Sequence, residues 1–424
     1  MTRVVLVLAF LAAAFAAAQA QLRGHGGPVR ALAVSRDGQG AISASFDETV
    51  IRWSLARNAA EQVLRFHEGS VNAVALAPDG RFATAGEDGR IAVWTPDADR
   101  PAAVLTGHTA PIAALAVSPD GRTLASASWD HTVRLWPIDG GEPRVLEGHQ
   151  QNVNGVAFMP DGRAVVSAGY DLSVRIWPVA GGSPTTTMVP SPLNGVVVAP
   201  DGEIVTGGAD GKLYFLSSAG EMRGEVAASE TPIIAIAISP SGALVAAAGI
   251  RGSVAIVDRG QHKVARTLVG PGLPVWSAAF LRDDRTLLTG GTDRMIRRWD
   301  ASTGDHIGSV AIAGIDDPLA RYAGDRGAEV FRACVACHTL SPDENNRAGP
   351  TLAGLFGRRI ATLPGYNFSP ALKKLDIVWT PETVAKLFEL GPMTYTPGTK
   401  MPEQKIGSAE DREALVKFLE KATR

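Results

Sequence analysis

Cysteine is nearly absent from this chain of 424 residues. Its two cysteines, Cys334 and Cys337, both lie in the segment RACVACHTL at residues 332–340, directly before His338. Any function that needs a thiol elsewhere in the chain is therefore excluded. Aromatic residues are also scarce, at 6%, whereas 46 glycines and 27 prolines are typical of many short strands joined by tight turns. The composition favours a mainly β protein.

A net charge of one sign is also lacking. The 41 Lys and Arg residues and the 43 Asp and Glu residues give a formal charge of −2. Because no field of one sign surrounds such a chain, we expect neither nucleic acid nor an anionic membrane as a partner. The chain is too long for one ordinary domain, and its 45% hydrophobic residues are enough for more than one core. We therefore expect at least two domains.

Long apolar runs are missing except at the N-terminus. There, Arg3 precedes an unbroken apolar run from Val4 to Ala18, and Ala18-Gln19-Ala20 has the small-residue pattern of a cleavage site. The run is shorter than the roughly 20 apolar residues of a membrane-spanning helix, so a cleaved signal is favoured over a membrane anchor. We predict a signal peptide at residues 1–20, a periplasmic location, and no stable membrane insertion after cleavage.

From residue 21 to residue 312, a pattern repeats roughly every 40 residues. Each copy contains an apolar strand, a P-D-G-type turn, a second strand, another turn and a third strand. The second turn has an anchor residue, usually Asp, at Asp47, Asp88, Asp130, Asp171, Asp210, Arg251 and Asp293. Two hairpins make one four-stranded sheet, which cannot bury both of its faces alone. Seven sheets stacked radially into a β-propeller are therefore predicted.

These copies resemble the WD-repeat family of β-propellers. In that family a histidine before the first strand, a hydroxyl in the second, the turn Asp and a Trp in the third form a buried hydrogen-bonded chain in each blade. The resemblance implies chains of His25, Ser45, Asp47 and Trp53 in blade one and of His108, Ser128, Asp130 and Trp136 in blade three. In blades two and four, Gly86 and Gly169 occupy the place of the hydroxyl, and blades five and six lack the Trp.

The histidines of the repeat are expected to be structural rather than metal ligands, because one recurs at the same place in four blades. Blades five and six are expected to depend more on apolar packing. Since only residues 21–23 precede the first repeat after cleavage, we expect the segment Asp305–Ile312 to supply the strand that closes the propeller. Trp129, beside the turn Asp, is a candidate docking residue if it is exposed.

Beyond Ile312 the repeat stops and helical patterns begin. Residues 313–321 are predicted to be a linker, and residues 322–424 a small all-α domain. Apolar residues at helical spacing predict one helix before the cysteines, which includes Phe331, and another that follows Ser408 as its N-cap. We expect these two helices to pack together.

The two cysteines and the histidine form the motif CxxCH. Cys334 and Cys337 lie about one helical turn apart, so their sulfurs project to one side, at the spacing of thioether bonds to one porphyrin, with His338 beneath the iron. The motif predicts one covalently attached haem c. A redox dithiol with an incidental histidine is the alternative, but the βαβ pattern of a thioredoxin-like domain is missing from the sequence.

The C-terminal domain resembles class I cytochromes c of the mitochondrial kind. The resemblance implies that the Pro350 carbonyl accepts a hydrogen bond from His338, and that Met401 is the distal iron ligand. It also implies that Arg358 and Trp379 hold a haem propionate. Met393 is the competing thioether, but it lacks the P-G-T-K loop that precedes Met401.

Iron with both axial positions filled by protein has no open site, so outer-sphere electron transfer is expected rather than catalysis. The leading hypothesis is a periplasmic electron carrier, with redox partner proteins that dock on the propeller, the haem edge or both. Two alternatives stay open: a quinoprotein-like enzyme whose propeller passes electrons to the haem, and a scaffold that senses the redox state of the haem. By resemblance, quinoprotein propellers have eight blades of another repeat type and often a vicinal disulfide, for which this chain has no cysteines.

Overall fold

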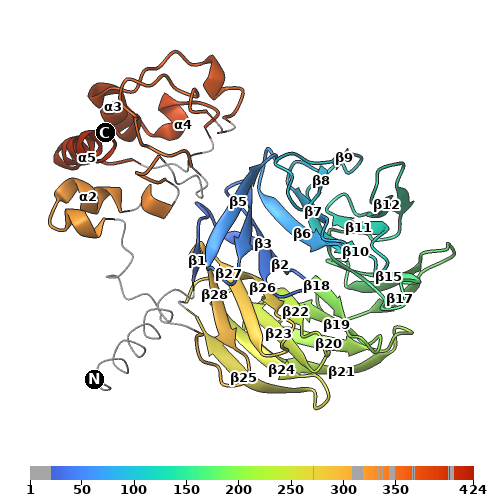
Figure 1. Ribbon diagram of the computed structural model, residues 1–424. Coiled ribbons are helices and arrows are strands. Elements are labelled where there is room, and N and C mark those ends of the chain that lie inside the picture. Colours follow the sequence, from blue (N-terminus) through green and yellow to red (C-terminus); the bar gives the residue numbers. More distant parts are fainter. Residues whose placement is uncertain are drawn as a thin grey trace, which may run out of the picture. The chain divides into compact units, whose positions relative to one another are not determined.

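The computed structural model describes residues 21–270, 272–307, 319–332, 334–336, 338–342, 349–364, 366, 368–399, 401 and 405–424 (Figure 1). The chain divides into two compact units, with the main boundary between Val310 and Ala311. The predicted signal peptide, the predicted linker up to residue 318, and Cys337 lie outside the described residues. No helix within the described ranges is long and apolar enough to cross a membrane.

The larger unit consists of seven four-stranded antiparallel sheets, which are the blades of a propeller (Figure 1). Blade one contains β2 (Val29–Val34), β3 (Gly40–Ser45), β4 (Thr49–Ser54) and β5 (Ala59–Arg65). Blade two contains β6 (Val71–Leu76), β7 (Phe82–Gly86), β8 (Ile91–Trp94) and β9 (Ala103–Leu105). Blade three contains β10 (Ile112–Val117), β11 (Thr123–Ser128), β12 (Val133–Pro137) and β13 (Arg144–Leu146). Blade four contains β14 (Val153–Phe158), β15 (Ala164–Gly169), β16 (Ser173–Pro178) and β17 (Thr185–Met188).

The remaining three blades follow the same order, except at the last strand. Blade five contains β18 (Leu193–Val198), β19 (Ile204–Gly208), β20 (Lys212–Leu216) and β21 (Met222–Ala227). Blade six contains β22 (Ile233–Ile238), β23 (Leu244–Gly249), β24 (Ser253–Asp258) and β25 (Lys263–Val269). Blade seven contains β26 (Val275–Phe280), β27 (Thr286–Gly291), β28 (Met295–Asp300) and, from the N-terminus, β1 (Leu22–Arg23). The predicted seven-bladed architecture is confirmed.

The first turn of each blade follows from its P-D-G-type sequence. In blade three, Asp120 Oδ1 accepts hydrogen bonds from Ser118 Oγ at 2.5 Å and from the Arg122 amide at 3.0 Å. Gly121 has a φ of +74°, a conformation that side-chain-bearing residues rarely adopt. Apolar side chains of neighbouring blades then pack together, as Ile91 of blade two does with Leu124 of blade three in one buried cluster. The blades therefore bury their faces against each other.

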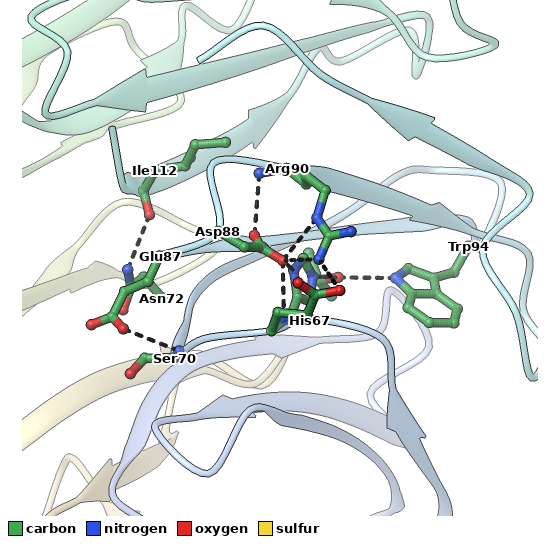
Figure 2. A network of polar contacts seen from close by, with 10 residues as sticks. His67, Ser70, Asn72, Glu87, Asp88, Arg90, Trp94 and Ile112 are labelled. Atoms are coloured by element: carbon green, nitrogen blue, oxygen red, sulfur yellow. Dashed lines mark hydrogen bonds and ion pairs between the residues drawn. The ribbon is translucent and has the colours of Figure 1, made fainter. Parts of the chain in front are cut away.

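Buried hydrogen-bonded chains are present in the blades, but their hydroxyls differ from the predicted ones. In blade two, His67 Nδ1 lies 2.9 Å from Asp88 Oδ2, and His67 Nε2 lies 2.8 Å from Thr84 Oγ1 (Figure 2). Trp94 Nε1 donates to the same Thr84 Oγ1 at 3.0 Å. Blade two therefore has a complete chain, and the prediction that Gly86 replaces its hydroxyl was wrong.

The same correction applies to the other blades. The Trp indole donates to Ser43 in blade one, Ser126 in blade three, Ser167 in blade four and Thr289 in blade seven. The predicted Ser45 and Ser128 lie two positions further along the same strands. Successive side chains of a strand alternate between its faces, so residues two positions apart lie on one face and sequence spacing alone did not distinguish them.

Blade five also has a polar chain, although it lacks the Trp. The Tyr214 hydroxyl, from β20, donates to Asp210 Oδ2 at 2.6 Å, and the Asp210 amide donates to Ser191 Oγ at 3.1 Å. Burial and the Asp210 carboxylate both raise the pKa of Tyr214, so the phenol remains protonated and able to donate. The expectation that this blade depends more on apolar packing did not include this polar chain.

Closure of the propeller uses the N-terminus after all. In the pairing of β1 with β28, Leu22 lies opposite Ile296, and Arg23 opposite Met295. Leu22 is 1% exposed and packs in the cluster between blades seven and one. The described part of the expected segment, residues 305–307, also pairs with β28, because the Ile307 amide donates to the Arg298 carbonyl at 3.0 Å, whereas residues 308–312 lie outside the described residues. The prediction that residues 21–23 are too short to close the propeller was wrong.

The smaller unit is mainly helical in its regular structure. Its α-helices are α2 (Arg326–Phe331), α3 (Pro381–Leu390), α4 (Pro392–Tyr395) and α5 (Ala409–Ala422). Its 3-10 helices are η2 (Ala320–Tyr322), η3 (Cys334–Ala336) and η4 (Leu372–Lys374). Ser408 caps α5 as predicted, because its side chain accepts a hydrogen bond from the Asp411 amide at 3.2 Å. The small all-α domain is confirmed as a fold class.

The packing of α2 against α5 depends on Gly327. A Cβ at this position would clash with the Ala414 carbonyl oxygen and the Phe418 side chain, so only glycine allows the two helices to come so close. The Phe331 and Phe418 rings lie 5.4 Å apart across the same contact. Leu319, within the predicted linker, is 1% exposed and belongs to this core. The packed unit therefore includes residues before Tyr322.

Candidate haem site

A helical turn begins at Cys334, in the described part of the CxxCH segment. Cys334 opens η3 and is 7% exposed, in contact with the core of the helical unit. The His338 amide donates to the Cys334 carbonyl at 2.9 Å, which is the hydrogen bond of one α-helical turn. This turn places His338 directly beside the thiol segment, although Cys337 itself lies outside the described residues.

The imidazole of His338 is oriented by a main-chain carbonyl. Its Nδ1 lies 2.8 Å from the Pro350 oxygen, and since a carbonyl only accepts, Nδ1 must carry the proton. In this tautomer Nε2 has the free lone pair, and an imidazole nitrogen with a free lone pair can bind a metal. Burial lowers the pKa of His338, against a smaller raising effect of the Pro350 bond, so the ring favours its neutral form.

Two contacts that the sequence did not reveal hold Pro350 in this position. The Leu352 amide donates to the Thr339 carbonyl at 2.9 Å, and Thr351 Oγ1 donates to the Ser341 carbonyl at 2.8 Å. They join the irregular segment around Pro350 to the residues that follow His338. Neither contact has a local sequence signal, because the bonded residues are ten to thirteen positions apart and belong to irregular segments.

Met401 and Met393 have different surroundings. Met401 is partly buried against the core of the helical unit, and its amide donates to Thr399 Oγ1 at 3.1 Å. Met393, on α4, is 66% exposed. The loop before Met401 is anchored by Ser369, whose hydroxyl donates to the Gly398 carbonyl at 2.7 Å. A thioether that lies against the apolar core suits a buried iron ligand better than an exposed one.

Arg358 and Trp379 are brought side by side by their main chains. The Trp379 amide donates to the Arg358 carbonyl at 3.0 Å, and the Gly357 amide donates to the Trp379 carbonyl at 2.8 Å. The Arg358 guanidinium donates to the carbonyls of Ala353 at 3.0 Å and Thr351 at 3.1 Å. Burial lowers the pKa of Arg358, and no carboxylate pairs with it among the described residues. A carboxylate bound here would be stabilised.

The apolar part of the unit also fits a porphyrin. Its buried core includes Phe331, Leu355 and Phe388, each less than 9% exposed. Partly buried apolar side chains pack against this core, among them Val330, Val335, Leu340, Leu352, Phe356, Trp379, Tyr395, Met401 and Ile406. Partly buried apolar side chains beside a compact core offer apolar surface against which a flat apolar ring can pack. The donor set, the cation and the apolar lining together suit haem c.

Comparison with known families agrees with this site. The family described as "Cytochrome c" matches residues 324–423. The family described as "WD domain, G-beta repeat" matches residues 17–54, 59–95, 99–137, 140–178 and 262–300, which are blades one to four and seven. Blades five and six, which lack the Trp, are the ones without a match.

Individual relatives extend the comparison of the helical unit. Cytochrome c of Cochliobolus lunatus is 40% identical over 100 residues, which are 23% of this chain and 92% of the relative. Cytochrome c of Arabidopsis thaliana is 40% identical over 100 residues, or 88% of its length. Cytochrome c2 of Blastochloris viridis is 38% identical over 95 residues, 22% of this chain and 74% of the relative. Through its C-terminal domain, which follows a seven-bladed WD-repeat propeller, the chain belongs to the cytochrome c family and has haem c as its covalently bound cofactor.

Proposed function

We propose that this protein is an exported, periplasmic electron carrier whose haem iron is held by His338 and Met401, and whose propeller docks a redox partner protein. Electron transfer by the haem follows from the cytochrome c domain. The location, the axial ligands and the role of the propeller are the new parts of the proposal. The assignment of His338 rests on the 2.8 Å bond between its Nδ1 and the Pro350 oxygen, and that of Met401 on its partial burial against the core, where Met393 is 66% exposed.

When bound, haem c supplies a one-electron couple at its iron. The chain's own residues determine the conditions for that couple. The Pro350 bond orients Nε2 of His338, the apolar core around Phe331 and Phe388 excludes water, and Arg358 offers a positive charge for a carboxylate. If His338 and Met401 both hold the iron, no position would stay open for a substrate, which favours a carrier over an enzyme.

Three blade histidines give support for the propeller as a docking scaffold. His67, His108 and His149 each bond to a turn Asp and to a hydroxyl, so both ring nitrogens are already used within their blades. Their hydroxyl partners, Thr84, Ser126 and Ser167, are each 0% exposed, so a substrate cannot reach them and a role in stabilising the blade is favoured. A binding role fits this arrangement better than a catalytic one, although the fold alone does not decide function.

The ligand assignment is tested on mature protein purified from the periplasm. Mass spectrometry should show one haem adduct on the CxxCH peptide, and the oxidised protein should have the sulfur-to-iron charge-transfer band. The variant Met401→Ala should lose that band and bind carbon monoxide in the ferrous state, because the iron then has an open position. Met393→Ala is the matched control and should keep the band. Loss of the band in Met393→Ala alone would contradict the assignment.

Export is tested separately. Cell fractionation should place the haem protein in the periplasm, and N-terminal sequencing of it should begin at Gln21. A mature chain that keeps residues 1–20, or one recovered with the membrane after a high-salt wash, would contradict the proposed export and release.

A further inference from the structure

One residue in every blade is extra in the pairing of the first two strands. In blade one, Val29 lies opposite Ser45 and Ala31 opposite Ala44, so Arg30 has no partner and forms a β-bulge. The same shift occurs in the other six blades, and the seven bulge residues are Arg30, Asn72, Ala113, Asn154, Asn194, Ile234 and Trp276. A bulge redirects its side chain. All seven bulges lie at the end of the propeller where the turn Asp residues lie.

Three of these positions are satisfied within the propeller. Asn72 donates to the Ile112 carbonyl at 3.3 Å (Figure 2), Asn154 to the Leu193 carbonyl at 3.0 Å, and Asn194 to the Ile233 carbonyl at 2.8 Å. Each bond crosses to the first strand of the next blade. In these blades the polar side chain at the bulge therefore joins neighbouring blades.

Arg30 is different. It is the one cation among the seven bulge residues, and within the described part of the chain it donates only a long 3.4 Å hydrogen bond to the Trp276 carbonyl. Among the described residues no carboxylate pairs with it, and the residue is partly rather than fully buried. Burial lowers the pKa of Arg30, which means that its charge is poorly compensated here.

Two aromatic rings lie beside this guanidinium. The Arg30 Cζ atom is 5.8 Å from the centre of the Trp276 ring, and the Phe46 ring is 5.8 Å from the same ring. The Trp276 indole is held by a 2.9 Å hydrogen bond to Thr292 Oγ1, whereas Phe46 is 37% exposed. A fixed cation beside an exposed aromatic surface can bind a carboxylate and an apolar side chain together.

We propose that Arg30, Trp276 and Phe46 form a docking site for an acidic segment of a partner protein. An Asp or Glu carboxylate of that segment pairs with Arg30, and a neighbouring apolar side chain packs on Phe46 and Trp276. The inference rests on the proposed docking role of the propeller, and it specifies the chemistry of the partner. A segment is favoured over a free anion, because the aromatic rings offer apolar area that a small anion cannot use.

Three more exposed apolar residues support an extended partner. Trp129 is 44% exposed, and Tyr170 and Ile250 are each 40% exposed. Like Phe46, each directly precedes the turn anchor of its blade, so they lie at the same end of the propeller. Trp129 is therefore exposed, which was the condition for a docking role. A segment anchored at Arg30 thus has apolar positions in other blades to contact.

The test selects random short peptides, displayed on phage, against the immobilised full-length haem protein. Selected peptides should contain Asp or Glu next to an aromatic or large aliphatic residue. A synthetic selected peptide should bind at least about tenfold more weakly to Arg30→Gln, since a charge-assisted bond is lost. Its amide counterpart, with Asn or Gln for the acid, should bind the wild type equally weakly.

The matched control is Arg36→Gln. Arg36 is exposed in the turn after β2, whereas Arg30 lies near the start of the same strand. Its replacement should change affinity by less than about twofold, the size expected for a surface charge. If Arg30→Gln fails to fold, Phe46→Ser carries the test, because an exposed side chain can be replaced without loss of the core.

Several results would overturn the inference. They are selected peptides without acidic residues, equal losses in Arg30→Gln and Arg36→Gln, and concentration-dependent self-association that Arg30→Gln abolishes, which would make a second copy the occupant. The haem spectrum of the same sample separates the two proposals. A normal reversible haem couple without acidic-peptide binding overturns this inference alone, whereas an absent couple overturns the electron-carrier proposal.

Discussion

At the scale of residues, single hydroxyl groups connect the histidine and tryptophan of a blade. Ser126 Oγ lies 2.7 Å from His108 Nε2 and accepts from Trp136 Nε1 at 2.8 Å, and it is 0% exposed. Because no water reaches this position, the two ring nitrogens have no substitute partner. The hydrogen-bonded chain of each such blade therefore depends on one buried hydroxyl oxygen.

Replacement of this hydroxyl should be costly. We expect Ser126→Ala to lower the free energy of unfolding of the propeller by about 2 to 3 kcal/mol, because two buried groups lose a hydrogen bond. Urea unfolding followed by tryptophan fluorescence measures the loss. Ser126→Thr is the control, because blade two has Thr84 at this position, and it should be clearly less destabilised. Equal stability of the alanine variant and the wild type would contradict the role of the hydroxyl.

Asp88 is expected to make the stability of the propeller sensitive to acid. Burial raises the pKa of this carboxyl, but its bonds to His67 and to main-chain amides outweigh burial and lower the pKa to about 2. A lowered pKa stabilises the folded state above the ordinary pKa near 3.8, and this contribution is lost as the pH falls through about 2. The temperature at which half of the wild type is unfolded should therefore decrease as the pH is lowered from about 4 to about 2.

The variant Asp88→Asn should be less stable at neutral pH and should lose less further stability over this acid range. Asp97→Asn is the control, since the Asp97 side chain is 97% exposed. It should follow the wild type. Parallel acid curves for Asp88→Asn and the wild type would show that another group causes the sensitivity.

At the scale of elements, the shortest strand has a large effect on closure. β1 has two residues, yet Leu22 is 1% exposed and packs with Ile51 and Ile296 from blades one and seven. Strands of this length are stable only when side-chain burial supports them. The repeat did not reveal this strand, because β1 lies outside the repeating pattern and its partner is about 270 residues away in the chain.

Leu22→Ala should lower the free energy of unfolding of the propeller by about 2 to 4 kcal/mol, the range for a buried leucine. Arg23→Ala is the neighbouring control. Arg23 is exposed, so its replacement should change stability by no more than about 0.5 kcal/mol. Thermal unfolding followed by circular dichroism measures both. A smaller loss for Leu22→Ala than for Arg23→Ala would show that β1 does not hold the propeller closed.

At the scale of the whole molecule, the two units differ in how they complete their cores. Each propeller cluster is made by side chains of neighbouring blades, whereas the helical unit leaves many apolar side chains partly buried around Phe331 and Phe388. The helical unit should therefore need its cofactor to fold, and the propeller should not.

The double variant Cys334→Ser/Cys337→Ser tests this difference. Without covalent haem, the helical signal in far-ultraviolet circular dichroism should be largely lost. The tryptophan-monitored unfolding temperature of the propeller should stay within about 2 °C of the wild type, as for an independent unit. The control, Met393→Ala, should keep both signals. A propeller that unfolds together with the haemless unit would contradict the expectation.

Sequence reasoning went furthest where the signal repeats or is local. The seven turn anchors predicted the blades, and Ser408 predicted the start of α5. It failed where the choice depends on packing. Ser43 and Ser45 lie on one face of β3, so spacing could not tell which one meets Trp53. The bonds of Thr339 and Ser369 that support the haem site join irregular segments, which have no periodic pattern.

The divided partner of β28 has a topological consequence. Leu22 lies opposite Ile296, and the Ile307 amide donates to the Arg298 carbonyl. β1 and the segment that ends at Ile307 therefore lie end to end along β28, and the break between them is opposite Arg297. The two segments therefore act together as the fourth strand of blade seven, although no covalent bond joins them. Consider a circular permutant in which Ile307 is joined directly to Gln21 and the new ends lie in the turn between β12 and β13. It should form the same propeller, with an unbroken fourth strand in blade seven.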